Sequence, residues 1–180
     1  TQLMDGTFAP ITDGTAVNIG KLVFGKNSSG NPQEWYILGK DEGVSGENTI
    51  IFAANSIATG QVFEDDYFNY KTFDSSFGVY ASNHPSEVYP NHYGASDLRV
   101  ALQGMATNTS YFTTAEQGLM NATTVTTNDT KNSATYTTTD KLYALAADGT
   151  GMSYQTIKAG TSDSTVLAMD SYWSSGDWFW

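Results

Sequence analysis

The sequence predicts an α+β domain built on antiparallel strands, and three observations lead to this prediction. Short runs of β-branched and aromatic residues come first, separated by clusters of Gly, Asn, Ser and Pro. Two short segments with helical spacing of apolar residues follow. A Thr-rich stretch with strand-like alternation comes next. The 180 residues have the length of one domain, which we expect to span residues 1–180.

Three strands are expected in the first part of the chain. They are residues 17–24 (VNIGKLVF), 34–38 (EWYIL) and 49–53 (TIIFA). Turn-forming clusters at residues 26–32 and 40–46 separate them. Two tight connections in succession predict an antiparallel meander.

Residues 61–95 show neither strand alternation nor a helical period, so we expect a long loop. The loop contains nine aromatic rings: Phe63, Tyr67, Phe68, Tyr70, Phe73, Phe77, Tyr80, Tyr89 and Tyr93. A loop of this length in a compact domain is commonly functional, and so many rings argue against disorder.

Helices and further strands are expected after the loop. Ser96 or Asp97 can cap a helix over residues 98–106, with Leu98, Ala101, Leu102 and Met105 on one face. Thr113 and Glu116 have capping-box spacing, which predicts a second helix to about residue 121 with Leu119 and Met120 facing inward. The sequence then predicts exposed strand over the Thr-rich residues 123–139, and further strands at 141–146 (KLYALA) and 164–169.

Composition excludes several classes of function. The net charge is −11, with 19 acids against eight Lys and Arg, so the chain lacks the basic clusters that bind nucleic acid or anionic lipid. There is no cysteine, which excludes disulfides, zinc–thiolate sites and cysteine nucleophiles. No apolar run approaches about 18 residues, so we expect no membrane insertion. The chain opens without a basic and apolar leader, and we expect a signal peptide to have been removed.

The order of several short motifs resembles a known family. A strand containing WYIL, the aromatic loop, SDLRVAL at residues 96–102, FTTAE at 112–116, TDKLYAL at 139–145 and a Trp-rich end follow one another. This order resembles an uncharacterised family of exported domains from Gram-positive bacteria, distantly similar to formylglycine-generating enzymes. The resemblance implies a C-type lectin-like fold and an extracellular or cell-surface location.

The last residues depart from that family. In the family, the aromatic pair that matches Trp178 and Trp180 leads into further strands, which this sequence lacks. We therefore expect a domain that lacks its C-terminal strands or borrows them from a partner chain. The terminal rings are then inner-sheet core residues, with a ligand platform as the alternative.

The aromatic loop is the expected binding surface. In C-type lectin-like folds this excursion commonly binds the ligand, and Tyr presents a broad, stiff face at low entropic cost. We expect Tyr67, Tyr70, Tyr89 and Tyr93 to face outward more than the Phe residues do, and His92 to join them as a binding residue. The alternative is that most rings pack inward as a small core of the loop.

The alternatives to ring-mediated binding are catalysis and metal binding. His92 with Ser86 or Ser96 and an acid could form a triad, but no nucleophile elbow accompanies them. We expect no cofactor. Calcium is the ion that would suit the acids of the loop, which are solvated side chains in the alternative interpretation: Glu64, Asp65, Asp66 and Glu87, with Asn69, His84 and His92 nearby. Arg99, the single arginine, is expected to pair with an interior acid.

The sequence therefore predicts a non-catalytic recognition or adhesion module that binds glycan or protein through its aromatic loop. One alternative is a structural subunit of a bacterial surface assembly, completed by a strand from a partner. Another alternative is an enzyme of unknown reaction, which a pocket holding His92 beside a carboxylate and a hydroxyl would favour.

Overall fold

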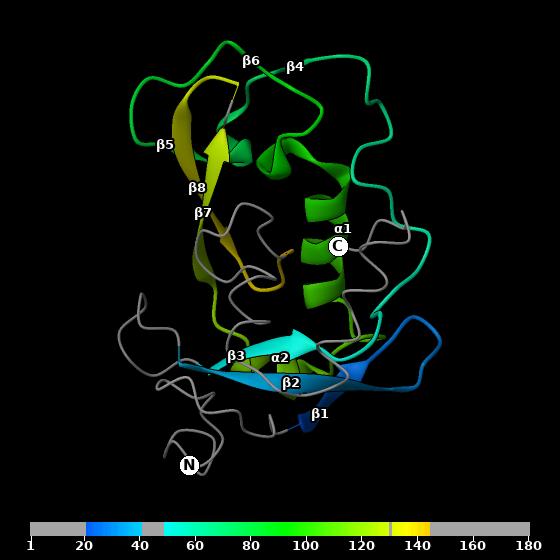
Figure 1. Ribbon diagram of the computed structural model, residues 1–180. Coiled ribbons are helices and arrows are strands. Elements are labelled where there is room, and N and C mark those ends of the chain that lie inside the picture. The colour runs from blue at the N-terminus through cyan, green and yellow to red at the C-terminus, as the bar shows by residue number, and fades with distance from the viewer. Residues whose placement is uncertain (1–20, 41–48, 130, 145–180) are drawn as a thin grey trace, which may run out of the picture. The chain divides into compact units, whose positions relative to one another are not determined.

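The computed structural model describes residues 21–40, 49–129 and 131–144 (Figure 1). The chain divides into two compact units. Unit 1 comprises Thr1–Ile57 and Leu145–Trp180, and unit 2 comprises Ala58–Ala144. Both contain antiparallel strands, and unit 2 adds two α-helices, so the fold is a small mixed α+β one. The expectation of a single domain over residues 1–180 stays a prediction.

Unit 1 contains the predicted meander. The strands β1 (Lys21–Lys26), β2 (Pro32–Lys40) and β3 (Thr49–Ala53) pair in the order β1-β2-β3, all antiparallel. The turn between β1 and β2 forms because the Asn27 side chain accepts hydrogen bonds from two backbone N–H groups two and four residues later. Residues 17–20 of the first predicted strand lie outside the described residues.

The two predicted helices are present in unit 2. Helix α1 (Asp97–Thr107) is capped by Ser96, whose hydroxyl accepts from the Arg99 N–H. Helix α2 (Thr114–Leu119) begins with the capping box of Thr113 and Glu116. In the part of the chain that the structure describes, no helix is long and apolar enough to cross a membrane.

The Thr-rich stretch forms a hairpin. The strands β7 (Thr123–Asp129) and β8 (Ala134–Asp140) pair antiparallel over their full length, which confirms strand in this stretch. The expectation that it is exposed is wrong for part of β8, because Tyr136 and Thr138 are buried. A two-residue strand, β5 (Val79–Tyr80), pairs with the other edge of β8, so the sheet order is β5-β8-β7.

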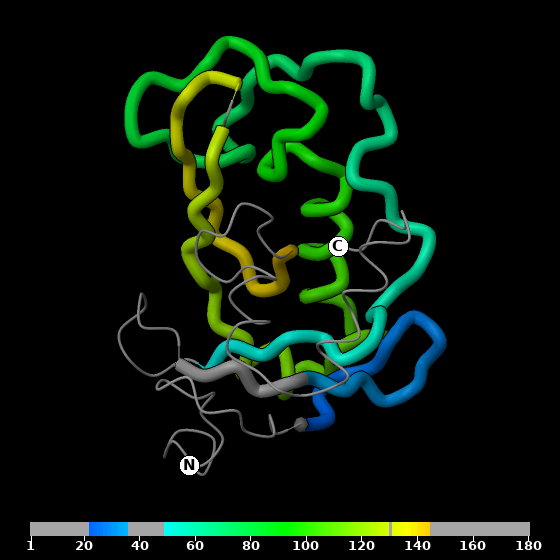
Figure 2. The backbone as a smooth tube through the Cα atoms, viewed as in Figure 1, coloured from blue at the N-terminus to red at the C-terminus, as the bar shows by residue number. Residues whose placement is uncertain are grey.

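The segment 61–95 is more regular than a structureless loop. It contains β4, β5, β6 and the 3-10 turns η1 and η2, with bounds Lys71–Thr72 (β4), Ser75–Phe77 (η1), Glu87–Val88 (β6) and Tyr93–Ala95 (η2). Figure 2 shows its backbone arching over one end of unit 2. These elements are too short to leave a period in the sequence, and β5 pairs with a strand far along the chain.

Two further sequence expectations differ from the structure, and two others concern residues that it does not describe. Residues 141–144 form no strand, so the prediction of a strand at 141–146 is wrong over its described part. Leu119 is 74% exposed, so the expectation that it faces inward is wrong. The predicted strand at 164–169 and the terminal Trp178 and Trp180 lie outside the described residues.

The core of unit 2 lies between α1 and the hairpin. Leu98, Leu102 and Met105 are buried on one face of α1, as their spacing predicted. Phe112 and Tyr136 are fully buried as well. These buried side chains are the largest apolar part of the core of unit 2.

Arg99 of α1 pairs with a buried acid, as predicted. It also connects α1 to β8, η1 and η2. Its Nε donates to Asp140 Oδ1 at 2.9 Å, and Asp140 is fully buried. Its Nη1 donates to the carbonyls of Ser76 in η1 and Gly94 in η2. The second carboxylate oxygen of Asp140 accepts from the Thr138 hydroxyl at 2.6 Å. The guanidinium and the carboxylate therefore each have more than one hydrogen-bond partner.

Removing Arg99 should destabilise the protein strongly. Arg99→Ala leaves the Asp140 carboxylate buried without its cation, which should lower the free energy of unfolding by about 3 to 5 kcal/mol. Urea denaturation measures this loss. The neighbouring Val100→Ala is the control, because Val100 is 69% exposed and should change stability by less than about 0.5 kcal/mol. Equal stability of the two variants would contradict the structural role of Arg99.

Gly94 should tolerate no side chain. A Cβ there would lie 1.7 Å from the Phe77 carbonyl oxygen, so Gly94→Ala must displace backbone and should cost about 3 kcal/mol or more. Gly104, within α1, has nothing within 4 Å of the same position, and Gly104→Ala should stabilise the protein by about 0.5 to 1 kcal/mol. Thermal unfolding of both variants tests the contrast, and a stable Gly94→Ala protein would refute this packing.

Candidate functional site

The five predicted binding residues divide into an exposed and a buried group. Tyr67 and Tyr70 are 65% and 52% exposed, and Tyr89 is half-buried. His92 and Tyr93 are buried in η2, with only 5% and 8% of their surface exposed. The expectation that Tyr93 faces outward is therefore wrong.

Local hydrogen bonds explain why His92 and Tyr93 turn inward. His92 caps η2, because its Nδ1 accepts from the Ala95 N–H at 3.2 Å. The Tyr93 carbonyl accepts from the Ser96 hydroxyl, which joins η2 to the start of α1. Burial raises the pKa of Tyr93, and the nearby negative charge of Asp140 raises it further. Tyr93 is thus a core residue that stays protonated.

A first pair of exposed rings consists of Tyr67 and Phe68. Their centroids lie 4.2 Å apart, and Phe68 is 78% exposed. The expectation that the tyrosines face outward more than the phenylalanines is wrong at this position. Hydrophobicity alone could not reveal the exposure of Phe68, because it is decided by the course of the surrounding chain.

A second ring pair, Tyr70 and Tyr89, extends the ribbon formed by β4 and β6. The register pairs Lys71 with Val88 and Thr72 with Glu87, so the next pair outward is Tyr70 with Tyr89, whose centroids lie 4.2 Å apart. Alternate residues of a strand point to opposite faces.

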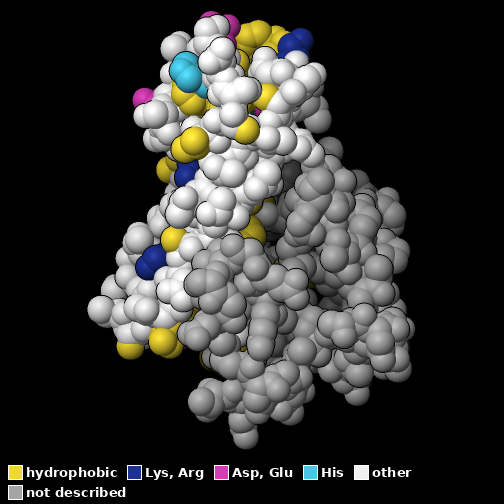
Figure 3. Space-filling view, turned by 90° about the vertical axis from the view of Figure 1, so that its left-hand side faces the viewer, with side chains coloured by type: hydrophobic (Ala, Val, Ile, Leu, Met, Phe, Trp, Pro, Cys, Tyr) yellow, Lys and Arg dark blue, Asp and Glu magenta, His cyan; other side chains and the backbone are white. Residues whose placement is uncertain are grey.

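The inner face of this ribbon is anchored. Val88 is fully buried, and Lys71 Nζ binds Glu64 Oε2 at 2.5 Å and the Ala95 carbonyl at 2.9 Å. The outer face carries Tyr70, Tyr89, Thr72 and Glu87. Figure 3 shows hydrophobic, acidic and basic side chains close together at the end of unit 2 that carries β4 and β6.

A lysine from the β7–β8 turn lies on the second ring pair. Lys131 Nζ is 4.8 Å from the centroid of the Tyr89 ring, within the range of a cation–π interaction. Hydrogen bonding with Lys131, and then with Tyr70, lowers the pKa of Tyr89, while the hydrogen bond with Tyr89 raises the pKa of Lys131. Sequence analysis missed Lys131, because only tertiary structure brings the hairpin turn to this ring.

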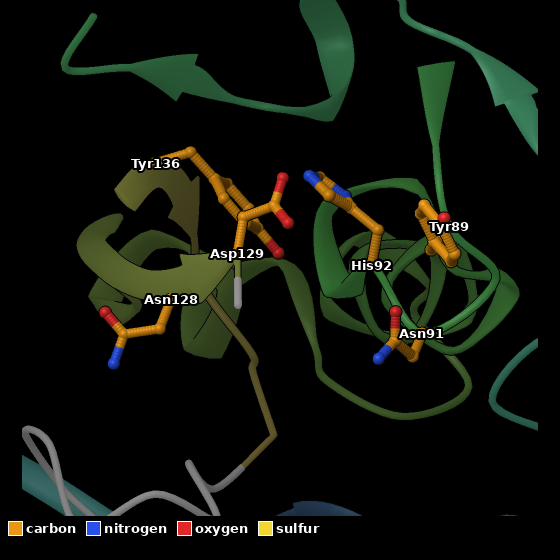
Figure 4. Close-up of a pocket in the computed structure, with 6 residues that line it drawn as sticks. All are labelled: Tyr89, Asn91, His92, Asn128, Asp129 and Tyr136. Carbon is orange, nitrogen blue, oxygen red and sulfur yellow. The ribbon is translucent and has the colours of Figure 1, made fainter. Parts of the chain in front are cut away.

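A buried polar cluster of Tyr80, His92 and Asp129 lies near Tyr89, and Figure 4 shows its His92 and Asp129. The Tyr80 hydroxyl is 2.6 Å from Asp129 Oδ2 and 3.0 Å from His92 Nε2, and Tyr136 stacks on His92 with ring centroids 4.1 Å apart. Asn132 donates to both carboxylate oxygens of Asp129 from its backbone and side chain. In Figure 4, the His92 ring and the Asp129 carboxylate point toward each other.

The pKa values of this cluster follow from its surroundings. Burial lowers the pKa of His92 to about 4, against the opposing effect of the Asp129 charge, so His92 is neutral at pH 7. Burial alone would raise the pKa of Asp129, but the hydrogen bonds from Tyr80 and Asn132 outweigh it and leave that pKa below its ordinary value. Burial raises the pKa of Tyr80, and the Asp129 carboxylate raises it further.

The hydrogen bonds leave His92 no free nitrogen for base catalysis. Its Nδ1 already accepts from a backbone N–H, so the ring proton lies on Nε2 and points at the Tyr80 oxygen. The Tyr80 hydroxyl in turn donates a hydrogen bond to the Asp129 carboxylate. A catalytic triad places the imidazole between the acid and the hydroxyl, whereas here the hydroxyl lies between the other two groups.

One cavity beside this cluster, on the His92 side, is small. Its volume is about 20 Å³, which is room for about one water molecule. Its lining residues are Tyr89, Asn91, His92, Asn128, Asp129 and Tyr136. A carboxylate and a hydroxyl do lie near His92, but the cavity that His92 lines is too small for a substrate. A wider hollow of about 560 Å³ reaches Asp129 from the side of Ser133 and Thr135, and His92 is not among its lining residues.

The loop acids do not converge on one point. Glu64 pairs with Lys71, Asp66 accepts from Asn69, and the exposed His84 stacks on Phe73. Among the residues described, no group of three or more His, Asp or Glu is placed to hold a metal ion. Calcium binding by this segment stays a prediction.

Comparisons with protein-family models, curated proteins and solved structures find no match. The resemblance drawn from the sequence motifs, and the C-type lectin-like topology that it implies, therefore stay predictions.

His92 should make the protein sensitive to acid. Its folded-state pKa of about 4 lies below the ordinary value of 6.5, so the unfolded chain binds this proton first as pH falls. The stability that His92 contributes is fully present above pH 6.5, and about 3 kcal/mol of it should be lost as pH falls from 6.5 to 4. Urea denaturation across this range measures the slope.

Two histidine variants test the assignment of that slope. His92→Gln should be less stable at pH 7 and should lack the His92 part of the slope. His84→Gln should keep the wild-type slope, because His84 is exposed. An unchanged slope in His92→Gln would show that another group causes the acid sensitivity.

Proposed function

We propose that this protein is a non-catalytic recognition or adhesion module that binds a glycan or protein ligand through the exposed rings of segment 61–95. The observation that carries this proposal is the set of large aromatic side chains that segment 61–95 leaves in contact with solvent. Tyr67, Phe68 and Tyr70 lie within four residues of one another, and each exposes more than half of its surface. We call these three rings and Tyr89 the ring surface.

Exposed rings in such number favour a binding role. Each exposed ring leaves apolar area in water that a ligand could cover, at about 25 cal/mol per Å². Aromatic residues are enriched among the side chains that dominate binding energy at interfaces, and they stack on sugar rings and apolar surfaces alike. Clustered exposed apolar residues on a folded protein commonly mark an interaction site.

The ring surface is also held in place before any ligand arrives. Asp97, at the start of α1, accepts from the Asp65 N–H at 2.8 Å, and the Phe63 carbonyl accepts from the Leu98 N–H. Lys71 anchors the following residues through Glu64 and the Ala95 carbonyl. A surface ordered in this way loses little conformational entropy on binding, which favours affinity.

The fold and location belong to the same proposal. A C-type lectin-like topology would place segment 61–95 on the binding face, which agrees with its exposed rings. The acidic composition and the absence of cysteine suit an exported bacterial surface protein. The alternative of a structural subunit completed by a partner strand depends on residues around Trp178 and Trp180, which lie outside the described residues.

Removing the first ring pair should weaken ligand binding strongly while leaving the fold intact. Tyr67→Ala/Phe68→Ala should weaken binding by about thirtyfold or more, because the loss of even one interface hot spot costs about 2 kcal/mol. Binding is measured on a glycan array and on an immobilised peptide library. The control is Val100→Ala/Leu119→Ala, which removes two side chains that are 69% and 74% exposed on the helices. No ligand in either library, or equal binding by both double variants, would contradict the proposed function.

A further inference from the structure

The outer face of the β4–β6 ribbon combines two rings with a carboxylate. Because β4 and β6 are antiparallel, Tyr70 and Tyr89 form one cross-strand pair and Thr72 and Glu87 form the next on the same face. Glu87 is exposed, and its negative charge is close enough to Tyr70 to raise the pKa of that phenol, after the larger effect of the Tyr89 hydrogen bond. Ring faces beside a carboxylate attract cations.

This face already holds a cation from the same chain. The Lys131 ammonium lies 4.8 Å from the Tyr89 centroid, and the β7–β8 turn that carries it is far from β6 in sequence. Lys131 is exposed, so this contact is made at the protein surface and is weak. A second ammonium or a guanidinium could therefore take its place at small cost.

The charge around the ring surface favours a basic partner. Segment 61–95 contains five acidic residues and one lysine, Lys71, which forms an ion pair with Glu64. Asp65, Asp66 and Glu87 are exposed. Arg99 forms an ion pair with Asp140. The whole chain carries a net charge of −11. Long-range attraction and the local ring–carboxylate arrangement thus select the same kind of partner.

We propose that the outer face of the β4–β6 ribbon binds a lysine or arginine side chain of a basic partner protein, which takes the position of Lys131 over Tyr89. This inference rests on the proposed function and specifies its ligand as a basic protein segment. Tyr70 and Tyr89 supply the ring faces, and Glu87 supplies the countercharge. Lys131 acts as an internal competitor that limits the affinity.

The test uses the whole chain and a labelled hexalysine peptide, with hexaglutamine as the uncharged comparison. Fluorescence anisotropy is measured at about 0.15 M salt, where the Debye length of about 8 Å screens distant charges. Tyr70→Ala/Tyr89→Ala changes no charge, so it should leave non-specific attraction intact. It should nevertheless weaken hexalysine binding by about fivefold or more.

Two charge variants test the site without disturbing the rings. Glu87→Gln should weaken binding more than Glu34→Gln, which removes an equal charge from an exposed position on β2. Lys131→Gln should strengthen binding by about two- to fivefold, and by more than Lys26→Gln, which removes an exposed lysine on β1. Circular dichroism checks that every variant is folded.

Each outcome decides the inference. Equal hexalysine binding by wild type and Tyr70→Ala/Tyr89→Ala overturns it, as does equal strengthening by Lys131→Gln and Lys26→Gln. A neutral glycan that requires Tyr70 and Tyr89 while hexalysine does not would overturn this inference and leave the proposed function standing. If neither hexalysine nor a glycan requires Tyr70 and Tyr89 for binding, and neither library yields a ligand, both this inference and the proposed function are contradicted.

Discussion

The ion pair between Arg99 and the buried Asp140 connects the parts of unit 2 on which the ring surface depends. From the first turn of α1, the guanidinium reaches β8 and the carbonyls of η1 and η2. Isolated 3-10 turns and two-residue strands do not offset the entropy of ordering them. The turns η1 and η2 of segment 61–95 are therefore held by a partly buried cation whose acid partner is fully buried.

The exposed rings are stabilised by residues on the opposite face of the same backbone. In the β4–β6 ribbon, Lys71 and Val88 point inward, where Lys71 finds Glu64 and the Ala95 carbonyl. Because successive side chains point to opposite faces of a strand, fixing the inward-facing side chains also fixes their neighbours on the solvent-exposed face. Tyr70 and Tyr89 are thus displayed by the same register that buries their neighbours.

Two polar systems lie close together in unit 2 and differ in what they offer a ligand. The hydrogen bonds of Tyr80, His92 and Asp129 are directed at one another and at nearby backbone, so these groups fix structure. Glu87 and the Lys131 ammonium lie at the surface beside rings. Buried groups that hydrogen-bond to one another leave few free donors or acceptors for a ligand. Exposed charges beside aromatic ring faces can still bind one.

The sequence by itself determined the elements whose causes lie within a few residues, namely the β1–β3 meander, the caps at Ser96 and Thr113 and the strand character of the Thr-rich residues 123–139. It also indicated that Arg99, the single arginine, pairs with an interior acid. Only the tertiary structure decided that Tyr93 is buried, that Phe68 and Leu119 are exposed, and that Lys131 lies on Tyr89. Caps and turns depend on neighbouring residues, whereas the covering of a ring depends on distant segments whose approach leaves no local pattern.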